Sequence, residues 1–171
     1  MSAKLTQWRL KEVLHYNPDT GAFTWTKCTG AAKAGSAAGC VKTASAALRY
    51  CVIRVDSALH RAHRLAWLYM TGDYPSGLID HVDGNGLNNR WCNLRQCSHS
   101  ENQQNRVKQV NNRSGYLGVS WAKYQNKWQA QITVRGDHKH LGFFEDPQEA
   151  HKVYLMAKSQ IHTFQPVPRD V

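Results

Sequence analysis

Four side chains between residues 80 and 102 have the types and spacing of a hydrolytic metal site: Asp80, His81, Asn93 and Asn102. A hard divalent cation prefers oxygen ligands and keeps several waters, so Asp80 and Asn102 would leave room for water and a phosphate oxygen. The imidazole of His81 could take a proton from water near neutral pH. Asn93 could accept a hydrogen bond from one ring nitrogen of His81 and so fix its tautomer.

These residues can converge only if the segment around them folds locally. The sequence predicts two paired strands and a helix, at residues 78–82, 91–95 and 98–106. "DGNG" provides the turn after the first strand, and Ser98 with Glu101 forms a capping-box signature before the helix. Asp80 and His81 are neighbours on a strand, so their side chains leave it on opposite faces. A helix across one face can bring Asn102 toward one of them.

Plainer interpretations of the same residues stay open. "DGNG" is also a common turn, and a histidine such as His81 can be a buried structural residue. An EF-hand loop is disfavoured, because Leu87 and Asn88 interrupt the alternating acidic ligands that it needs. His63, in "AHRLAW", is expected to pack and not to catalyse.

The segments "IDHVDGNGLNNRWCNLR" and "SENQQN" resemble the HNH motif of the ββα-metal nucleases, specifically the phage and homing endonuclease branch. The resemblance implies that His81 is the general base and that Asn93 orients it. It implies that Asp80 and Asn102 bind a single Mg²⁺ or Mn²⁺ ion. Other branches carry a second histidine where this chain has Asn102, which makes the preferred ion less certain.

Three more residues of this segment are candidates for support or for contact with DNA. Asn89 and Arg90 belong to the "NNR" that usually precedes the second strand of the motif. Arg95 follows on that strand and is assigned to DNA binding.

The chain before residue 78 is predicted to be the scaffold of this site. A helix is expected over 4–16, a strand over 22–26, a strand over 49–55 and a helix over 60–70. Gly72 ends the last helix and Pro75 keeps it from resuming. Residues 29–47 are rich in small residues and are predicted to be loop or weak strand.

A second pattern begins at residue 115, with three alternating strands, turns at 123–127 and 135–138, and an amphipathic helix over 147–163. Apolar residues alternate along the middle strand, from Trp128 to Val134, and form the face that is expected to pack against the helix. The opposite face carries amides and cations, which can contact phosphates and base edges.

The segments "GYLGVSW", "KWQAQI" and "LGFFEDPQEAHKVYLMA" are similar to the AP2 DNA-binding domain, which also occurs fused to HNH nucleases. The resemblance implies that the exposed strand residues contact DNA: Lys123, Lys127, Gln129, Gln131, Arg135 and His140. Leu117 and Ser120 stand where plant members usually carry arginines, so the plant-type base specificity is in doubt.

The net charge of +10 favours an anionic partner, with nucleic acid ahead of a membrane surface. Residues 106–114 are predicted to be a basic linker whose cations Arg106, Lys108 and Arg113 could follow a DNA groove. The five cysteines contain no C-x-x-C pair, which argues against a structural zinc site. No secretory signal or membrane span is recognised, so a cytoplasmic location in a bacterial or phage-infected cell is expected.

The sequence therefore predicts an α+β protein with an HNH nuclease domain over 1–105 and an AP2-like domain over 115–165. Its expected activity is metal-dependent hydrolysis of duplex DNA by a monomer or a homodimer, as a nickase or a double-strand cutter. A non-cleaving DNA-binding regulator with a decayed motif is the alternative, and an RNA-binding protein is a third hypothesis.

Overall fold

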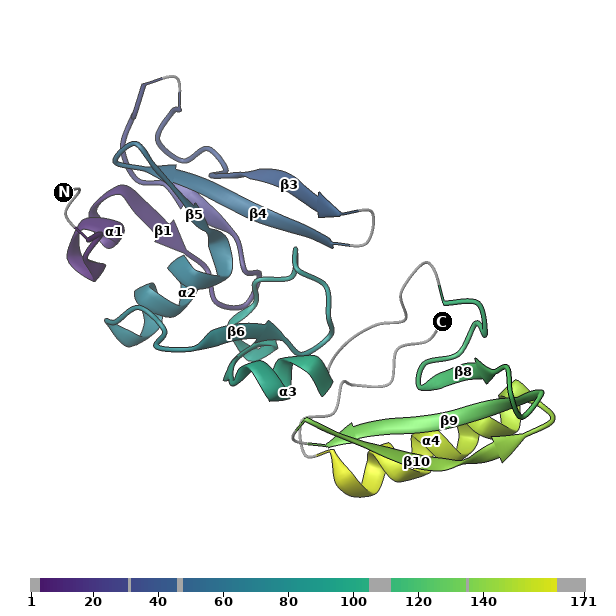
Figure 1. The fold of residues 1–171 in the computed structure, drawn as a ribbon. Helices are drawn as coiled ribbons and strands as arrows, with labels where there is room; N and C mark the ends of the chain where they lie inside the picture. The colour runs from purple at the N-terminus through teal and green to yellow at the C-terminus, as the bar shows by residue number, and fades with distance from the viewer. Residues whose placement is uncertain (1–3, 31, 46–47, 105–111, 135, 163–171) are drawn as a thin grey trace. The chain divides into compact units, whose positions relative to one another are not determined.

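The computed structural model describes residues 4–30, 32–45, 48–104, 112–134 and 136–162 (Figure 1). The chain divides into two compact units, Met1–Ser98 and His99–Val171. The predicted domain limits place residues 99–105 with the first part instead, and they stay a prediction. Residues 105–111, which hold most of the predicted linker, lie outside the described residues.

Within its described residues, the first unit contains two helices, seven strands and one 3₁₀ turn. In chain order they are α1 (Gln7–Val13), β1 (Leu14–Tyr16), β2 (Phe23–Trp25), β3 (Cys40–Ser45), β4 (Leu48–Val55), β5 (Ala58–Arg61), α2 (Ala62–Thr71), β6 (Leu78–His81), the turn η1 (Trp91–Asn93) and β7 (Leu94–Cys97). The strands form three antiparallel sheets, ordered β1-β2, β3-β4-β5 and β6-β7.

The first predicted helix is shorter than expected. Thr6 caps α1 by accepting a hydrogen bond from Arg9 N at 3.2 Å, but the helix ends at Val13. Residues 14–16 then alternate buried, exposed and buried, and pair with β2 as a strand. Trp8 of α1 is 74% exposed.

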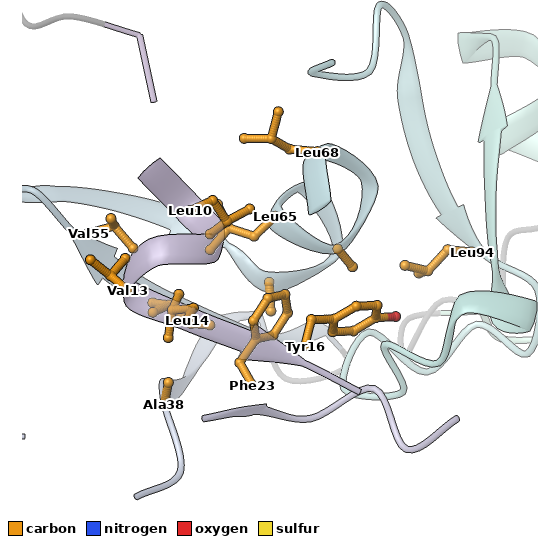
Figure 2. Close-up of a cluster of buried hydrophobic side chains, with 13 residues drawn as sticks. Leu10, Val13, Leu14, Tyr16, Phe23, Ala38, Val55, Leu65, Leu68 and Leu94 are labelled. Atoms are coloured by element: carbon orange, nitrogen blue, oxygen red, sulfur yellow. The ribbon is translucent and has the colours of Figure 1, made fainter. Parts of the chain in front are cut away.

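The main core of the first unit joins its helices to its strands. Leu10, Leu14 and Leu65 are fully buried within it, together with Tyr16 (Figure 2). Leu94 of β7 belongs to the same cluster. Strand β7, which follows the loop after β6, therefore packs against the core of the scaffold through Leu94.

The predicted helix over 60–70 is found, as α2 over Ala62–Thr71. It follows β5, a strand that the sequence did not predict. Gly72 ends α2 with φ of 92°, a left-handed conformation that glycine adopts at little cost.

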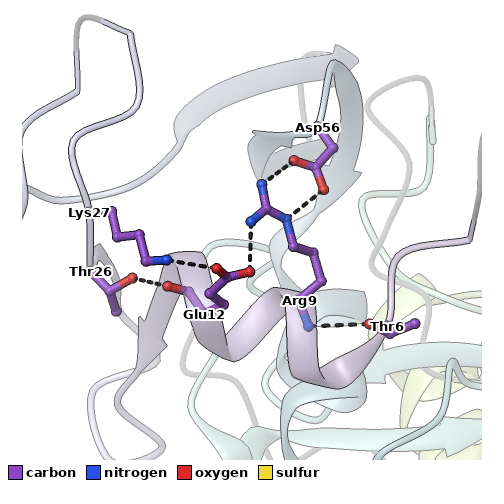
Figure 3. A network of polar contacts seen from close by, with 6 residues as sticks. All are labelled: Thr6, Arg9, Glu12, Thr26, Lys27 and Asp56. Carbon is purple, nitrogen blue, oxygen red and sulfur yellow. Dashed lines mark hydrogen bonds and ion pairs between the residues drawn. The ribbon is translucent and has the colours of Figure 1, made fainter.

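A polar network fastens α1 to two other segments (Figure 3). Arg9 contacts both carboxylate oxygens of Asp56 in the β4–β5 turn, at 2.8 and 3.0 Å, and Glu12 at 2.7 Å. Lys27, after β2, also pairs with Glu12 at 2.7 Å.

The strand pair β6–β7 differs from its prediction at one end. The second strand was expected over 91–95, but Trp91–Asn93 is a 3₁₀ turn and β7 begins at Leu94. Asp80 consequently pairs with Arg95, and His81 pairs with Leu94. Asn93 lies in the turn and not on the neighbouring strand.

The second unit begins with the short helix α3 (His99–Gln104), directly after Ser98. Its sheet contains β8 (Val119–Ala122), β9 (Lys127–Val134) and β10 (Asp137–Phe144), in the order β10-β9-β8, and α4 (Pro147–Ile161) packs against it. The three antiparallel strands and the following helix agree with the sequence prediction. Val119, Ala130 and Ala150 form the small buried core between them.

Within the described parts of the chain, no helix is long and apolar enough to cross a membrane.

Candidate functional site

His81 is the last residue of β6 and is only 5% exposed. Its Nε2 lies 3.2 Å from Oδ1 of Asn89, whose own Nδ2 donates to Leu87 O at 3.3 Å. Because the amide oxygen of Asn89 faces the ring, Nε2 is the nitrogen that carries the proton. Nδ1 is then the basic nitrogen of His81.

The surroundings of His81 favour its neutral form. Burial lowers the pKa of His81, although the hydrogen bond to Asn89 and the carboxylates of Asp83 and Asp80 act in the opposite direction. A neutral imidazole at pH 7 can accept a proton, as a general base must.

Two rings of the scaffold lie close to the ring of His81 and to each other. His63 of α2 meets it edge-on, with ring centroids 5.0 Å apart, and Tyr50 of β4 lies 6.4 Å away. Burial, together with smaller contributions from His81, Arg61 and Arg64, lowers the pKa of His63 to about 3. His63 therefore packs as a neutral ring, and its buried Nδ1 has no hydrogen-bond partner within the described residues.

Asp80 is 7% exposed and forms an ion pair across the β6–β7 ladder. Arg95 donates to its Oδ2 from Nε at 3.0 Å and from Nη2 at 2.9 Å. Arg95 had been assigned to DNA contact from the sequence. In the structure its guanidinium is engaged with the predicted metal ligand.

The structure corrects the contact expected for Asn93. Asn93 is buried, but its Nδ2 donates to Asp83 Oδ1 at 3.0 Å and to Asn88 O at 2.8 Å. Its Oδ1 accepts from Asp83 N at 3.0 Å. Asn93 thus hydrogen-bonds to the loop between β6 and β7. Asn89, and not Asn93, contacts the imidazole of His81. The reason is the 3₁₀ turn, which places Asn93 before β7 begins.

Asp83 is the residue of this loop that the sequence analysis missed. Its carboxylate also accepts from Asn85 N at 2.8 Å and from Asn88 Nδ2 at 2.7 Å. Burial raises the pKa of Asp83, but the hydrogen bonds from Asn85, Asn88 and Asn93 outweigh it and leave the pKa below its usual value. The signal was present in "DGNG", because an Asp before Gly commonly binds the backbone two residues ahead.

The loop is also anchored to the scaffold. Tyr16 OH donates to Asn89 O at 2.7 Å, and Trp91 N donates to Pro18 O at 2.9 Å. Gly86 lies so close to β4 that a Cβ there would overlap the carbonyl oxygen of Arg49. Asn89 is 3% exposed, so it supports the site and does not present its side chain to a phosphate.

The predicted metal ligands are placed in different compact units. Asp80 lies on β6, and Asn102 is a half-buried residue of α3. Their pairing around one ion therefore remains a proposal. Among the described residues, no three His, Cys, Asp or Glu side chains gather in a way that could hold a metal ion.

The outer face of the β8–β10 sheet is polar, as predicted. Ala130 and Ile132 of β9 point inward, whereas Gln131 and Thr133 are exposed. Gln129 is half-buried and its Nε2 lies 3.1 Å from Nδ1 of His140 on β10.

The remaining predicted DNA contacts differ in their surroundings. Arg90, Arg113 and Lys123 are exposed. Lys127 pairs with Glu145 at 2.8 Å, which reduces the positive charge available there. Arg106, Lys108 and Arg135 lie outside the described residues.

Part of the chain is similar to a known protein family. Residues 60–104 match the model of a family described as HNH endonuclease. This range includes α2, the β6–β7 pair, the loop between them and α3. The match covers about a quarter of the chain.

A phage protein shares part of the chain. "Protein 3.8" of Escherichia phage T7 is 39% identical over 77 residues, which are 44% of this chain and 64% of the relative. The matched region thus spans less than two thirds of that relative, whose name gives no activity. No solved structure matches the chain. The family match ends at residue 104, so the AP2 resemblance of the later sheet remains a prediction.

Proposed function

We propose that this protein is a site-specific DNA endonuclease of the phage and homing type, which hydrolyses a phosphodiester bond with one divalent metal ion. The observation that carries the proposal is the buried, neutral His81, held through Nε2 by Asn89, within the segment that matches the HNH endonuclease family. This arrangement leaves a basic nitrogen at the end of β6, next to a carboxylate.

The available donors fit a magnesium-sized ion by their chemistry. Asp80 already binds a positively charged group, the guanidinium of Arg95, so its environment accepts a cation. Asn102 would contribute a neutral amide oxygen, and hard ions are bound by such oxygen ligands. Bound there, Mg²⁺ or Mn²⁺ would stabilise the added negative charge on the phosphate and on the leaving 3′ oxygen.

The residues of the chain supply the proton transfer. His81 removes a proton from a water through Nδ1, and the water attacks the scissile phosphorus. Asn89 accepts from Nε2–H, which keeps Nδ1 unprotonated and available until it takes the proton. The products carry 5′ phosphate and 3′ hydroxyl ends.

The polar face of the β8–β10 sheet would position this site on duplex DNA. Exposed Gln131 and His140 lie on neighbouring strands, opposite each other in the ladder. Amide side chains can read adenine in the major groove, and a small sheet fits that groove. A monomer would nick one strand, and a homodimer would cut both. The cytoplasm of a bacterial or phage-infected cell is the proposed location.

Replacing His81 by Ala tests the nuclease assignment. Supercoiled plasmid is incubated with each protein and Mg²⁺ or Mn²⁺, with EDTA as the metal-free control. The wild type should nick and H81A should lose at least about 100-fold of the rate, as expected for a general base, while both bind duplex DNA equally. Equal cutting by H81A would refute the assignment of the base.

The same assay separates the alternative functions. A wild-type protein that binds duplex DNA but does not cut it with either ion would be a regulator with a decayed site. Preference for single-stranded RNA over duplex DNA in competition would indicate an RNA-binding protein.

A further inference from the structure

The ion pair between Asp80 and Arg95 occupies the carboxylate that the proposed function assigns to a metal ion. The two residues are direct partners across the β6–β7 ladder, so their side chains lie on the same face. Both Nε and Nη2 of Arg95 reach the same oxygen, Oδ2, at 3.0 and 2.9 Å. The side chain of Asp80 is 9% exposed and that of Arg95 is 25% exposed.

We propose that Arg95 neutralises Asp80 in the metal-free protein and transfers to the scissile phosphate when the ion binds. This inference rests on the proposed endonuclease function and adds a catalytic residue to it. It gives Arg95 two anionic partners in succession, first the carboxylate and then the phosphate.

The metal-free role follows from burial. A carboxylate as buried as Asp80 is destabilising if it has no partner, because its charge has been removed from water. The guanidinium of Arg95 compensates that charge with two charge-assisted hydrogen bonds. The carboxylate is therefore held in one orientation before an ion arrives.

The transfer follows from charge repulsion. A divalent ion on Asp80 would lie a few ångström from the guanidinium of Arg95, where like charges repel strongly because little water screens them. The side chain of Arg95 is 25% exposed, so part of it contacts the solvent from which DNA arrives. A planar guanidinium matches two phosphate oxygens, so the incoming phosphate offers Arg95 an equivalent partner.

A purely structural role makes a different prediction. If Arg95 only braces β6 against β7, its removal should weaken the site and leave metal affinity unchanged or lower. If Arg95 competes with the ion for Asp80, its removal should make metal binding tighter. The sign of the change in metal affinity distinguishes the two roles.

The test compares wild type with Arg95→Gln and Arg95→Lys, in the full chain. Mn²⁺ binding without DNA is measured by calorimetry, and R95Q should bind about tenfold more tightly, a usual size for coupling between two binding events. Single-turnover cleavage at saturating Mn²⁺ should slow by about 100-fold in R95Q, as for loss of one donor to a transition state. R95K keeps the charge without the planar fork, so its Mn²⁺ affinity should stay near that of wild type while its cleavage slows.

Thermal unfolding shows whether a variant has a folding defect. R95Q should be less stable than wild type without metal, and Mn²⁺ should raise its melting temperature more than that of wild type. Arg9→Ala is the matched control, because Arg9 also pairs with carboxylates but on α1. R9A should leave Mn²⁺ affinity and the cleavage rate unchanged.

The outcomes separate this proposal from the endonuclease proposal. Unchanged or weaker Mn²⁺ binding by R95Q overturns the competition at Asp80, whether or not the wild type cuts DNA. Tighter Mn²⁺ binding with a wild-type cleavage rate overturns the transfer to phosphate. Tighter binding by R95Q together with an inactive wild type supports the competition, while the endonuclease proposal fails.

Discussion

At the residue scale, the candidate site is an arrangement of amides around one imidazole and two carboxylates. Asn89 holds Nε2 of His81, and Asn93 binds Asp83 through both atoms of its amide. The two asparagines therefore have different effects. Asn89 sets the tautomer of His81, the proposed base, and Asn93 sets the shape of the loop that carries Asn89.

The role of Asn89 can be tested with two variants. Asn89→Ala removes the acceptor for Nε2–H, so the cleavage rate should fall by about 10–100-fold, the usual cost of losing such an orienting partner. Asn89→Asp keeps an acceptor oxygen and should recover most of the rate at neutral pH. Single-turnover kinetics at saturating DNA and metal measure both.

Asn93 is tested through the free energy of unfolding, whereas Asn89 is tested through the cleavage rate. Asn93→Ala leaves hydrogen-bonding groups of the loop unpaired, so its free energy of unfolding should fall by about 2–3 kcal/mol.

Equal cleavage by N89A and wild type would show that another group orients His81.

At the element scale, packing overrides local pattern at two places. The period of apolar residues predicts one helix through residue 16, but Leu14 and Tyr16 become fully buried by forming β1. The predicted strand at 91–95 starts later, because Trp91–Asn93 is a 3₁₀ turn whose backbone is tied to Pro18. Both segments end with their apolar residues in the core, and their secondary structure follows from that burial.

Helix α1 also makes the acid stability of the first unit testable. Hydrogen bonding to Arg9 lowers the pKa of Asp56, and hydrogen bonds from Lys27 and then Arg9 lower the pKa of Glu12. A carboxyl whose pKa is lower in the folded state adds stability above its ordinary pKa, here 3.8 for Asp56 and 4.5 for Glu12. That stability is lost as the pH falls through the lowered values.

Arg9→Ala should therefore reduce the sensitivity of the protein to acid. Between about pH 6 and pH 3 the melting temperature of wild type should fall further than that of R9A. Arg54→Ala is the control, because exposed Arg54 donates to a carbonyl, that of Ser57, at 2.9 Å. The melting temperature of R54A should fall as much as that of wild type. An equally large fall in R9A would contradict the role of the contacts of Arg9 with Asp56 and Glu12.

At the scale of the whole molecule, the proposed nuclease site and a polar sheet face lie in one basic chain. The net charge of +10 favours binding to DNA of any sequence, and that binding weakens steeply with salt. Sequence preference must come from side chains that reach base edges, and the amides of the β9 face are the candidates.

Gln131→Ala tests whether the β9 face contributes to sequence preference. Exposed Gln131 should contribute about 1–3 kcal/mol of discrimination at its base, so Q131A should bind the recognition sequence more weakly. Cleavage under saturating protein should be unchanged. Gln160→Ala, at an exposed position of α4, is the matched control, and anisotropy at fixed salt measures both. Equal affinity of Q131A and wild type would remove Gln131 from the interface.

The sequence by itself determined the order of elements from strand β6 to helix α3, the three strands and helix of the second unit, and the candidate base His81. These follow from residue type, local periodicity and turn chemistry, which act over a few neighbouring residues. Only the tertiary structure decided that Asn89 contacts the imidazole, that Arg95 pairs with Asp80 and that His63 and Tyr50 lie near the ring of His81. Those contacts depend on strand register and on packing between distant segments, and a shift of one residue in either changes which side chains meet.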